Sequence, residues 1–97
     1  DDEERAAAPS LHRALDAIVR AVRSGEHDRE RALARGREQL VAPLREAYLD
    51  IVDPATFAAA DDVRPPALAI ASGWCGTTRL IDNEPIEPDG GLGMPSA

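Results

Sequence analysis

The sequence predicts an α+β fold in which an N-terminal helical hairpin packs on a small, mainly antiparallel sheet of about three strands. Three observations lead to this prediction. Apolar residues in the first half of the chain recur with helical spacing, the period then changes to that of strands, and turn residues separate the segments. Helices first and strands after are typical of an α+β layer.

The predicted helical region begins with a short segment that a proline interrupts. Acidic residues followed by alanines favour a helix over residues 2–8. Pro9 is expected to break or kink this helix, because proline has no amide donor and disfavours a helical residue before it. The main helix is then expected over residues 10–24, with Gly25 as a left-handed cap. Its apolar stripe consists of Leu11, Leu15, Ile18 and Val22.

A further helix is predicted over residues 27–41. Its apolar stripe is thinner and includes Leu33 and Leu40, while its alternating charges indicate a solvated face. Pro43 is expected to end it. A short glycine-containing loop between two helices predicts an antiparallel helical hairpin.

Three strands are predicted in the second half of the chain, over residues 47–52, 67–72 and 77–82. The second is rich in alanine, and such small residues suit a buried position under helices. A bend over residues 73–76 is expected to pair the second strand with the third. Asp82 and Asn83 are expected to form a tight turn or a bulge, since both residue types hydrogen-bond their own backbone.

The remaining segments are predicted to be irregular. Residues 55–66 are interpreted as a loop, with one possible helical turn near residues 54–57. Residues 88–97 hold several glycines and prolines and are interpreted as an irregular tail.

Composition limits the possible partners. The chain has 97 residues and a net charge of −7, from 18 acidic and 11 basic residues. An acidic surface repels phosphate backbones, so no nucleic-acid partner is expected. No apolar run approaches the length of about 20 residues that a membrane span needs, and no membrane partner or secretory signal is expected.

Two residue types narrow the chemistry further. All basic residues are arginine, so no Schiff base, lysine base or phosphate-loop lysine is available within this chain. Cys75 is the single cysteine, which excludes an internal disulfide framework and agrees with a cytoplasmic location.

Several candidate functional residues are predicted to be structural. His12 and His27 have no cysteine pair near them and do not form a zinc-binding pattern, so we expect both at the surface. Asp61 and Asp62 are adjacent in a loop, so their carboxylates are expected to diverge into solvent rather than share a metal. The glycine-rich segment 90–93 neither follows a clear strand nor precedes a helix, so it is interpreted as part of the tail and not as a phosphate loop.

Three residues near the predicted bend leave alternatives open. Cys75 has no predictable base beside it and is interpreted as a partly buried small residue. Trp74 is interpreted as a core anchor or an interface residue. Arg79 either has a structural role, as a hydrogen-bonded or ion-paired guanidinium that ties its strand to a loop or helix end, or contacts a phosphate or carboxylate of a ligand. No catalytic, substrate-binding, cofactor-binding or metal-binding residue is assigned in this chain.

The order of four motifs resembles one enzyme family. An acidic helix start at residues 2–5 is followed by Ala-Pro-x-Leu-x-x-Ala-Leu at residues 8–15, and later by Tyr-Leu-Asp-Ile-Val-Asp at 48–53 and Arg-Leu-Ile-Asp-Asn at 79–83. Together they are similar to the C-terminal domain of pantothenate synthetases, also called pantoate–β-alanine ligases. The resemblance implies that residues 1–87 are a C-terminal lid domain and that residues 88–97 are a tail.

The resemblance also implies a parent enzyme with two domains. An N-terminal adenylyltransferase-like domain would activate pantoate with Mg-ATP to give pantoyl adenylate, and β-alanine would then attack to give pantothenate and AMP. None of the family's principal catalytic motifs matches these residues, so the isolated chain is expected to be inactive. A homodimer is a further expectation, biological in the full enzyme and adventitious in the fragment. The alternative is a stand-alone acidic α+β module that binds a protein partner without catalysis.

Overall fold

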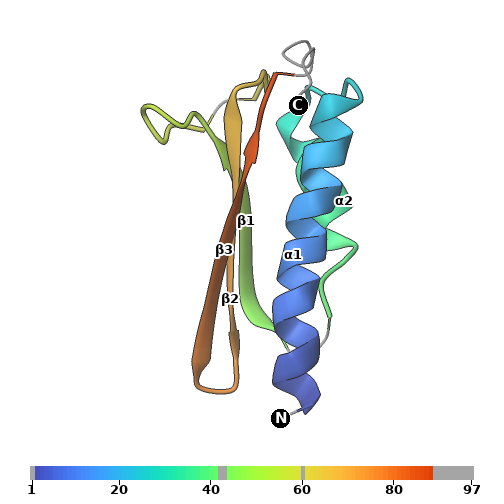
Figure 1. Ribbon diagram of the computed structural model, residues 1–97, viewed down its shortest axis with the longest axis vertical. Helices are drawn as coiled ribbons and strands as arrows, with labels where there is room; N and C mark the ends of the chain where they lie inside the picture. Colours follow the sequence, from blue (N-terminus) through green and yellow to red (C-terminus); the bar gives the residue numbers. More distant parts are fainter. Residues whose placement is uncertain (1, 42–43, 60, 89–97) are drawn as a thin grey trace, which may run out of the picture.

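Two helices cover one face of a three-stranded antiparallel sheet in the computed structural model, which describes residues 2–41, 44–59 and 61–88 (Figure 1). In chain order the elements are α1 (Asp2–Arg23), α2 (Arg29–Arg37), β1 (Arg45–Val52), β2 (Ala67–Cys75) and β3 (Thr78–Ile86). The strand order is β1-β2-β3, so β2 is central and pairs with both neighbours. This arrangement confirms the predicted α+β class.

Helix α1 is continuous through Pro9, and the predicted break at this residue is wrong. The proline lies on the exposed side of the helix, while Ala7 and Ser10 on the opposite side are fully buried. The Ser10 hydroxyl donates a hydrogen bond of 2.7 Å to the Ala7 carbonyl within this turn. One buried stripe therefore continues from Ala7 through Leu11 and Ala14, and its tertiary packing outweighs the local penalty of the proline.

The end of α1 confirms the predicted glycine cap. Gly25 has a positive φ of 114°, which a residue with a side chain rarely adopts. The Gly25 amide donates to the Val22 carbonyl and the Glu26 amide donates to the Ala21 carbonyl. These two bonds form the Schellman arrangement, which turns the chain back toward α2.

Helix α2 is shorter than predicted. It begins after the N-cap Asp28, whose carboxylate accepts a 3.0 Å hydrogen bond from the Arg31 amide. It ends at Arg37 rather than near residue 41, and the bond from the Leu40 amide to the Arg37 carbonyl closes a tighter turn there. Leu40 packs against the core from this turn, so its apolar character reflects burial and not continued helix. The predicted stop at Pro43 lies outside the described residues.

The two helices approach closely at Gly36. A methyl group built on Gly36 would lie 2.8 Å from Cδ1 and 2.9 Å from Cγ1 of Ile18, and 3.1 Å from the Ala14 carbonyl oxygen. Ile18 and Ala14 are both fully buried in α1. The absence of a side chain at residue 36 therefore sets the distance between the helices in the hairpin.

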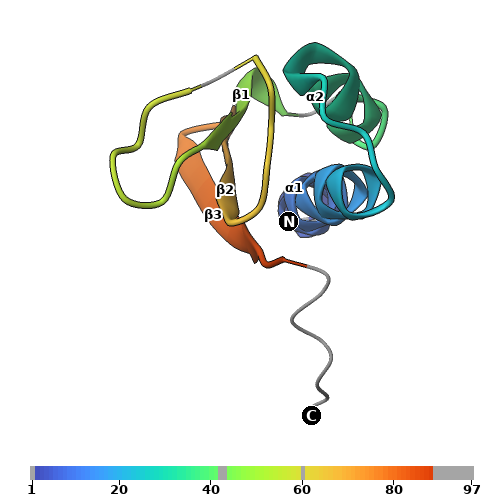
Figure 2. The ribbon, with the colours of Figure 1, turned by 90° about the horizontal axis from the view of Figure 1, so that it is seen from above.

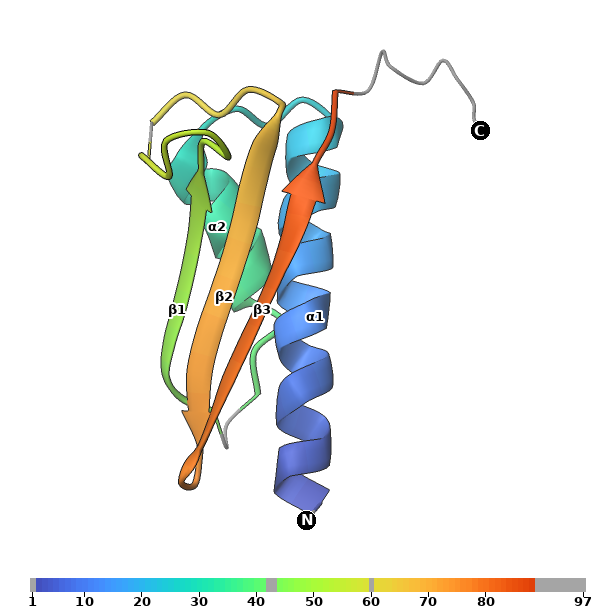
Figure 3. The same ribbon diagram turned by 60° about the vertical axis from the view of Figure 1, so that its left-hand side comes forward.

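The core lies between the helices and one face of the sheet. Strand β2 alternates buried and half-buried residues along its whole length. Its buried side is small and consists of Ala67, Ala69, Ala71, Gly73 and Cys75. Figures 2 and 3 show both helices on this side of the sheet, with α1 running along β3 and α2 nearer β1. As predicted, the alanines of β2 lie under the helices, where small side chains leave room for the leucines and Ile18 of α1.

Among the residues that the structure describes, no helix covers the opposite side of the sheet (Figure 1). Residues paired across antiparallel strands share a face, so the register identifies the residues of this side. One row joins Arg45, Trp74 and Arg79, and the next joins Tyr48, Ser72 and Ile81. We call this side of the sheet the open face. It extends from the row of Trp74, through the rows of Ser72 and Ile70, to the row of Leu68.

Strand β3 and its hairpin differ from the prediction. Strand β2 continues to Cys75, and the turn is limited to Gly76 and Thr77 rather than to a bend over residues 73–76. Gly76 has a φ of 63°, as the first central residue of a type II′ turn requires. Asp82 and Asn83 form no turn or bulge, because the register of β3 is unbroken from Thr78 to Ile86. The sheet ladder thus outweighs the local turn preference, and Pro85 is tolerated because β3 is an edge strand.

A loop after β1 projects to the side of the sheet away from the helices (Figures 1 and 2). The Asp53 carboxylate accepts hydrogen bonds from the amides of Ala55 and Thr56, and the Phe57 amide donates to the Asp53 carbonyl. These contacts make the single turn expected near residues 54–57. Phe57 has a φ of 62° and is 67% exposed, so an aromatic ring is presented to solvent by a tightly bonded loop.

The close contact at Gly36 gives a stability prediction. In an open helix, Gly to Ala stabilises by about 1 kcal/mol. Here we expect Gly36→Ala to lower the free energy of unfolding by about 1–3 kcal/mol, because the buried Ile18 side chain and the Ala14 carbonyl would have to shift to admit the methyl group. Denaturant unfolding followed by circular dichroism measures this. The double variant Gly36→Ala/Ile18→Val should recover part of the loss, and a Gly36→Ala protein more stable than wild type would contradict the packing described.

Candidate functional site

The most ordered polar cluster joins α2 to β1 and consists of Arg29, Asp50 and Tyr48. The Asp50 carboxylate accepts hydrogen bonds from Arg29 Nε at 2.9 Å and from Arg29 Nη2 at 2.6 Å. It also accepts from the Tyr48 hydroxyl at 2.7 Å and from the Ile51 amide at 2.8 Å. The Asp50 side chain is only 9% exposed and that of Arg29 is 22% exposed. The four bonds satisfy a carboxylate that is almost removed from water.

Each member of the cluster titrates away from its usual range. Burial acts to raise the pKa of Asp50, but the hydrogen bonds from Tyr48 and Arg29 and from the Ile51 amide outweigh it, so the pKa is lowered. The hydrogen bond to Asp50 raises the pKa of Arg29. The same carboxylate, followed by burial, raises the pKa of Tyr48. The cluster is thus held with Asp50 ionised and Tyr48 protonated.

This arrangement is suited to positioning rather than to reaction. A general base has to be able to accept a proton near neutral pH, and the bonds to Asp50 make that carboxylate a poorer base. Two backbone hydrogen bonds extend the connection. The Arg29 amide donates to the Asp61 carbonyl, and the Val63 amide donates to the His27 carbonyl. The cluster therefore ties the start of α2 to β1 and to the loop before β2.

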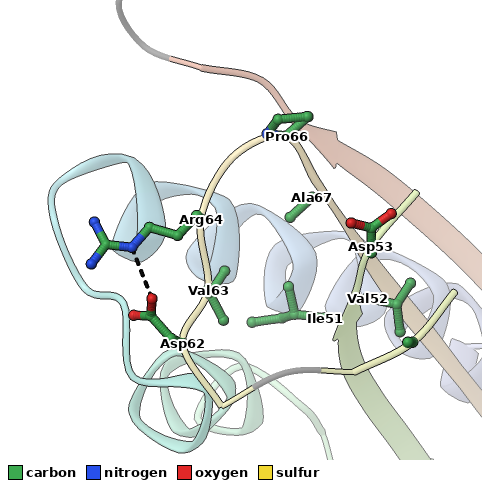
Figure 4. A pocket seen from close by; sticks show the side chains of 9 residues that line it. Ile51, Val52, Asp53, Asp62, Val63, Arg64, Pro66 and Ala67 are labelled. Atoms are coloured by element: carbon green, nitrogen blue, oxygen red, sulfur yellow. Dashed lines mark hydrogen bonds and ion pairs between the residues drawn. The ribbon is translucent and has the colours of Figure 1, made fainter. Parts of the chain in front are cut away.

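A small cavity lies beside this connection, between the end of β1 and the loop that leads into β2 (Figure 4). Its volume is about 180 Å³. Sites for nucleotides and drug-sized ligands typically measure about 300–1,000 Å³. The charged groups on its wall already have partners, since Arg64 pairs with Asp62 at 2.9 Å and Asp53 binds the loop amides. The cavity can hold water or a very small ligand, but not a nucleotide.

Within the described part of the chain, neither histidine belongs to a group of side chains that could bind a metal ion. His12 is largely exposed, as predicted, with Nδ1 3.6 Å from Oδ2 of Asp82. His27 is half-buried and its carbonyl is engaged by Val63. Within residues 2–41, 44–59 and 61–88, no three His, Cys, Asp or Glu side chains converge as metal ligands would.

The acidic pair is exposed as predicted, whereas Cys75 differs from its prediction. Asp61 and Asp62 are exposed, and Asp62 forms an ion pair with Arg64 rather than converging with its neighbour. Cys75 is a free, buried thiol at the end of β2, more enclosed than the partly buried residue predicted at a bend. The glycine-rich segment 90–93 lies outside the described residues.

Trp74 and Arg79 lie side by side on the open face. Arg79 is exposed, and the expected structural ion pair does not form with any residue that the structure describes. Trp74 is half-buried between Arg79 and Arg45, and Nη2 of Arg45 donates a 2.7 Å hydrogen bond to the Gly76 carbonyl. The interpretation of Trp74 as an interface residue therefore agrees with its place on the open face better than that of a core anchor.

The Arg29–Asp50 pair is not indicated by any sequence pattern. The signal available was Asp50 itself, since an acid within an apolar strand requires a partner if it is buried. Eleven arginines are candidates for that partner, and nothing in the order of residues selects Arg29. Only the packing of α2 against β1 brings the two side chains together.

The described residues define a class of protein module. It is a two-layer α+β domain whose layers are joined by a hydrogen-bonded polar cluster, and its described residues do not assemble a nucleophile, base and oxyanion site. Neither described helix combines the length and the apolar content needed to cross a bilayer. The family model described as pantoate-beta-alanine ligase matches residues 1–85. The chain belongs to the pantoate–β-alanine ligase family.

Named relatives agree with this assignment. The chain is 39% identical over 82 residues to the pantothenate synthetase of Pseudomonas entomophila, covering 84% of this chain and 29% of that protein. It is 42% identical over 90 residues to that of Azotobacter vinelandii, covering 90% and 31%. The crystal structure of the Thermus thermophilus enzyme superposes with a TM-score of 0.81 at 37% identity, over 91% of this chain and 32% of that one. The chain thus spans about a third of the length of the relatives it matches.

The buried cluster predicts that replacing two different aspartates has very different effects on the free energy of unfolding. Asp50→Asn should lower the free energy of unfolding by about 1–3 kcal/mol, because it weakens the bonds from Arg29 and Tyr48 in a site shielded from water. The control is Asp62→Asn, which removes an exposed pair at a similar distance and should change stability by less than about 0.5 kcal/mol. Chemical denaturation measures both, and equal effects would mean that burial does not strengthen the Arg29–Asp50 pair.

The lowered pKa of Asp50 predicts how the loss of stability in Asp50→Asn depends on pH. The group contributes stability above the pKa of Asp in the unfolded chain, about 3.9, and that contribution is lost as the pH falls through the lower pKa of the folded state. The gap in unfolding free energy between wild type and Asp50→Asn should therefore be constant from about pH 6 to 5 and narrow below about pH 4. A gap that stays constant down to about pH 2 would contradict the direction of the shift.

Proposed function

We propose that residues 1–87 form the C-terminal lid domain of an ATP-dependent ligase that condenses pantoate with β-alanine to give pantothenate. The reaction proposed for the whole enzyme passes through pantoyl adenylate and releases pyrophosphate and then AMP. The catalytic groups lie in the two thirds of the relatives' polypeptide that this chain does not span. The chain alone is inactive.

One observation carries the proposal: a match along residues 1–85 accounts for only about 30% of each relative. The chemistry of the described residues supports it. The best-bonded carboxylate, Asp50, is held as an ion by four donors, and the cavity near β1 is too small for a nucleotide. The chain also has no lysine that could contact a phosphate.

A lid has a definite physical role in this chemistry. An acyl adenylate is a reactive mixed anhydride, and water would hydrolyse it before the amine attacked. A domain that closes over the nucleotide site excludes water and strengthens the local electrostatic interactions. Bonds such as those of the Arg29–Asp50–Tyr48 cluster keep a domain of this size rigid during such a movement.

The partners proposed for this domain follow from that role. They are an adenylyltransferase-like catalytic domain and, through it, Mg-ATP, pantoate and β-alanine. The described residues offer no set of metal ligands, so the magnesium of Mg-ATP is assigned to the catalytic domain. We place the enzyme in the cytoplasm, in agreement with a single unpaired cysteine.

The activity test uses the isolated chain and a chimera. In the chimera, residues 1–85 replace the matching segment of the Thermus thermophilus synthetase, which has the same fold. The chain alone, supplied with Mg-ATP, pantoate and β-alanine, should form no pantothenate, whereas the chimera should form it. Product is measured by mass spectrometry, with the remainder of the Thermus enzyme without any lid as the control.

Two outcomes would contradict the proposal. Pantothenate formed by the isolated chain would show that the reacting groups are within these residues. A chimera that folds but is inactive would favour the alternative of a stand-alone module that binds a protein partner.

A further inference from the structure

The exposed apolar side chains of this domain are not scattered. Among the described residues, the large apolar side chains most exposed to solvent are Tyr48 at 51%, Phe57 at 67% and Ile81 at 68%. Tyr48 and Ile81 both pair with Ser72, so they flank one row of the open face. Phe57 belongs to the loop that projects to the same side of the sheet (Figures 1 and 2). All three therefore lie on the side away from the helices.

The pattern of β3 makes this side unusual for a solvated surface. Its residues alternate, with Arg79, Ile81, Asn83 and Pro85 exposed and the residues between them half-buried. A strand that faces water on one side carries polar residues there. Ile81 breaks that rule at the edge of the sheet. It pairs with Ser72, and its diagonal neighbours on β2 are the half-buried Ile70 and Trp74. Large exposed apolar side chains gathered on one face mark a surface that another structure covers.

Charge distinguishes one end of the same surface. The chain carries a net charge of −7, yet Trp74 has an arginine on each side in its row, Arg45 and Arg79. Asp50, which pairs with Ile70 across β2, is already bound to Arg29. The surface therefore combines exposed apolar side chains with two arginines at the hairpin end. Its complement would be apolar with carboxylates or other anionic groups facing the two arginines.

We infer that the open face, with the Phe57 loop at its far end, is the surface through which this domain docks on the remaining two thirds of the synthetase polypeptide. The inference rests on the proposed function and adds to it which face of the domain meets the catalytic part. The structure that covers this face is inferred from the length of the relatives, because this chain spans only 29%, 31% and 32% of the three compared above. The helices face solvent in this arrangement.

The test compares two added charges in the Thermus chimera. Ile81→Arg places a cation on the β3 edge of the open face, and we expect the domain to remain folded because Ile81 is 68% exposed. Ala34→Arg places the same charge on the exposed side of α2 and serves as the matched control. We expect Ile81→Arg to lower the kcat/KM of the chimera by about tenfold or more, and Ala34→Arg to change it by less than about twofold.

A second readout does not depend on activity. Trp74 and Tyr48 are the single tryptophan and tyrosine of this chain, so hydroxyl-radical labelling followed by mass spectrometry reports each residue separately. Both should be labelled severalfold more slowly in the chimera than in the isolated chain, and Ile81→Arg should restore fast labelling. The unfolding of the isolated Ile81→Arg chain confirms that the domain remains folded.

The outcomes separate the inference from the proposed function. An active chimera in which Trp74 and Tyr48 are labelled as fast as in the isolated chain, or in which Ile81→Arg and Ala34→Arg behave alike, would overturn the inference alone. An inactive chimera with both residues protected would support the docking surface and contradict the proposed function. If Trp74 and Tyr48 of the isolated chain were protected from labelling at high concentration, and sedimentation velocity showed dimers, the face would be assigned to a second copy of the chain and the inference would be overturned.

Discussion

The structure depends on one constraint: three strands and two helices can bury only one face of the sheet. Strand β2 is built for this, since its buried side is limited to alanine, glycine and cysteine while larger residues occupy its other side. The small side lets α1 and α2 pack close to the sheet, and Gly36 lets the helices pack close to each other. The other face, with Trp74 and Ile81, is left to whatever covers it. Both the stability of the domain and its proposed role follow from this asymmetry.

The polar contacts reinforce the same layers. Asp50 is removed from water by Arg29 and Tyr48, and the bond between Asp50 and Arg29 crosses from β1 to α2. A single substitution that leaves one of these charges unpaired is costly, whereas exposed pairs such as Asp62–Arg64 contribute little. The cluster makes the domain rigid without offering a reactive group. A rigid, unreactive domain is suited to covering a site rather than forming one.

Much of this arrangement could be predicted from residue spacing. The stripe of Leu11, Leu15 and Ile18, the Gly25 cap and the alanine-rich strand all appear where their patterns indicate. The errors share a cause, since each occurred where tertiary contacts outweigh a local preference. Pro9 remains in helix because buried residues continue on both sides of it, and Asp82 and Asn83 remain in strand because β2 pairs with them throughout.

The site was less predictable than the fold. The resemblance of residues 79–83 and the earlier motifs to one family indicated the enzyme class, but the partner of Asp50 required the packed structure. The open face was also hidden, because an exposed Ile81 looks like any core isoleucine until the register shows which side it faces.

The most direct test of this account is a nuclear magnetic resonance titration of the ¹⁵N-labelled chain with the unlabelled remainder of the Thermus thermophilus synthetase. The account predicts amide shift changes concentrated in β3, in β2 from Leu68 to Trp74 and in the loop around Phe57, with α2 unaffected. It also predicts no shift changes when Mg-ATP is added to the chain alone. Changes concentrated on the helices, or saturable binding of Mg-ATP by the isolated chain, would contradict it.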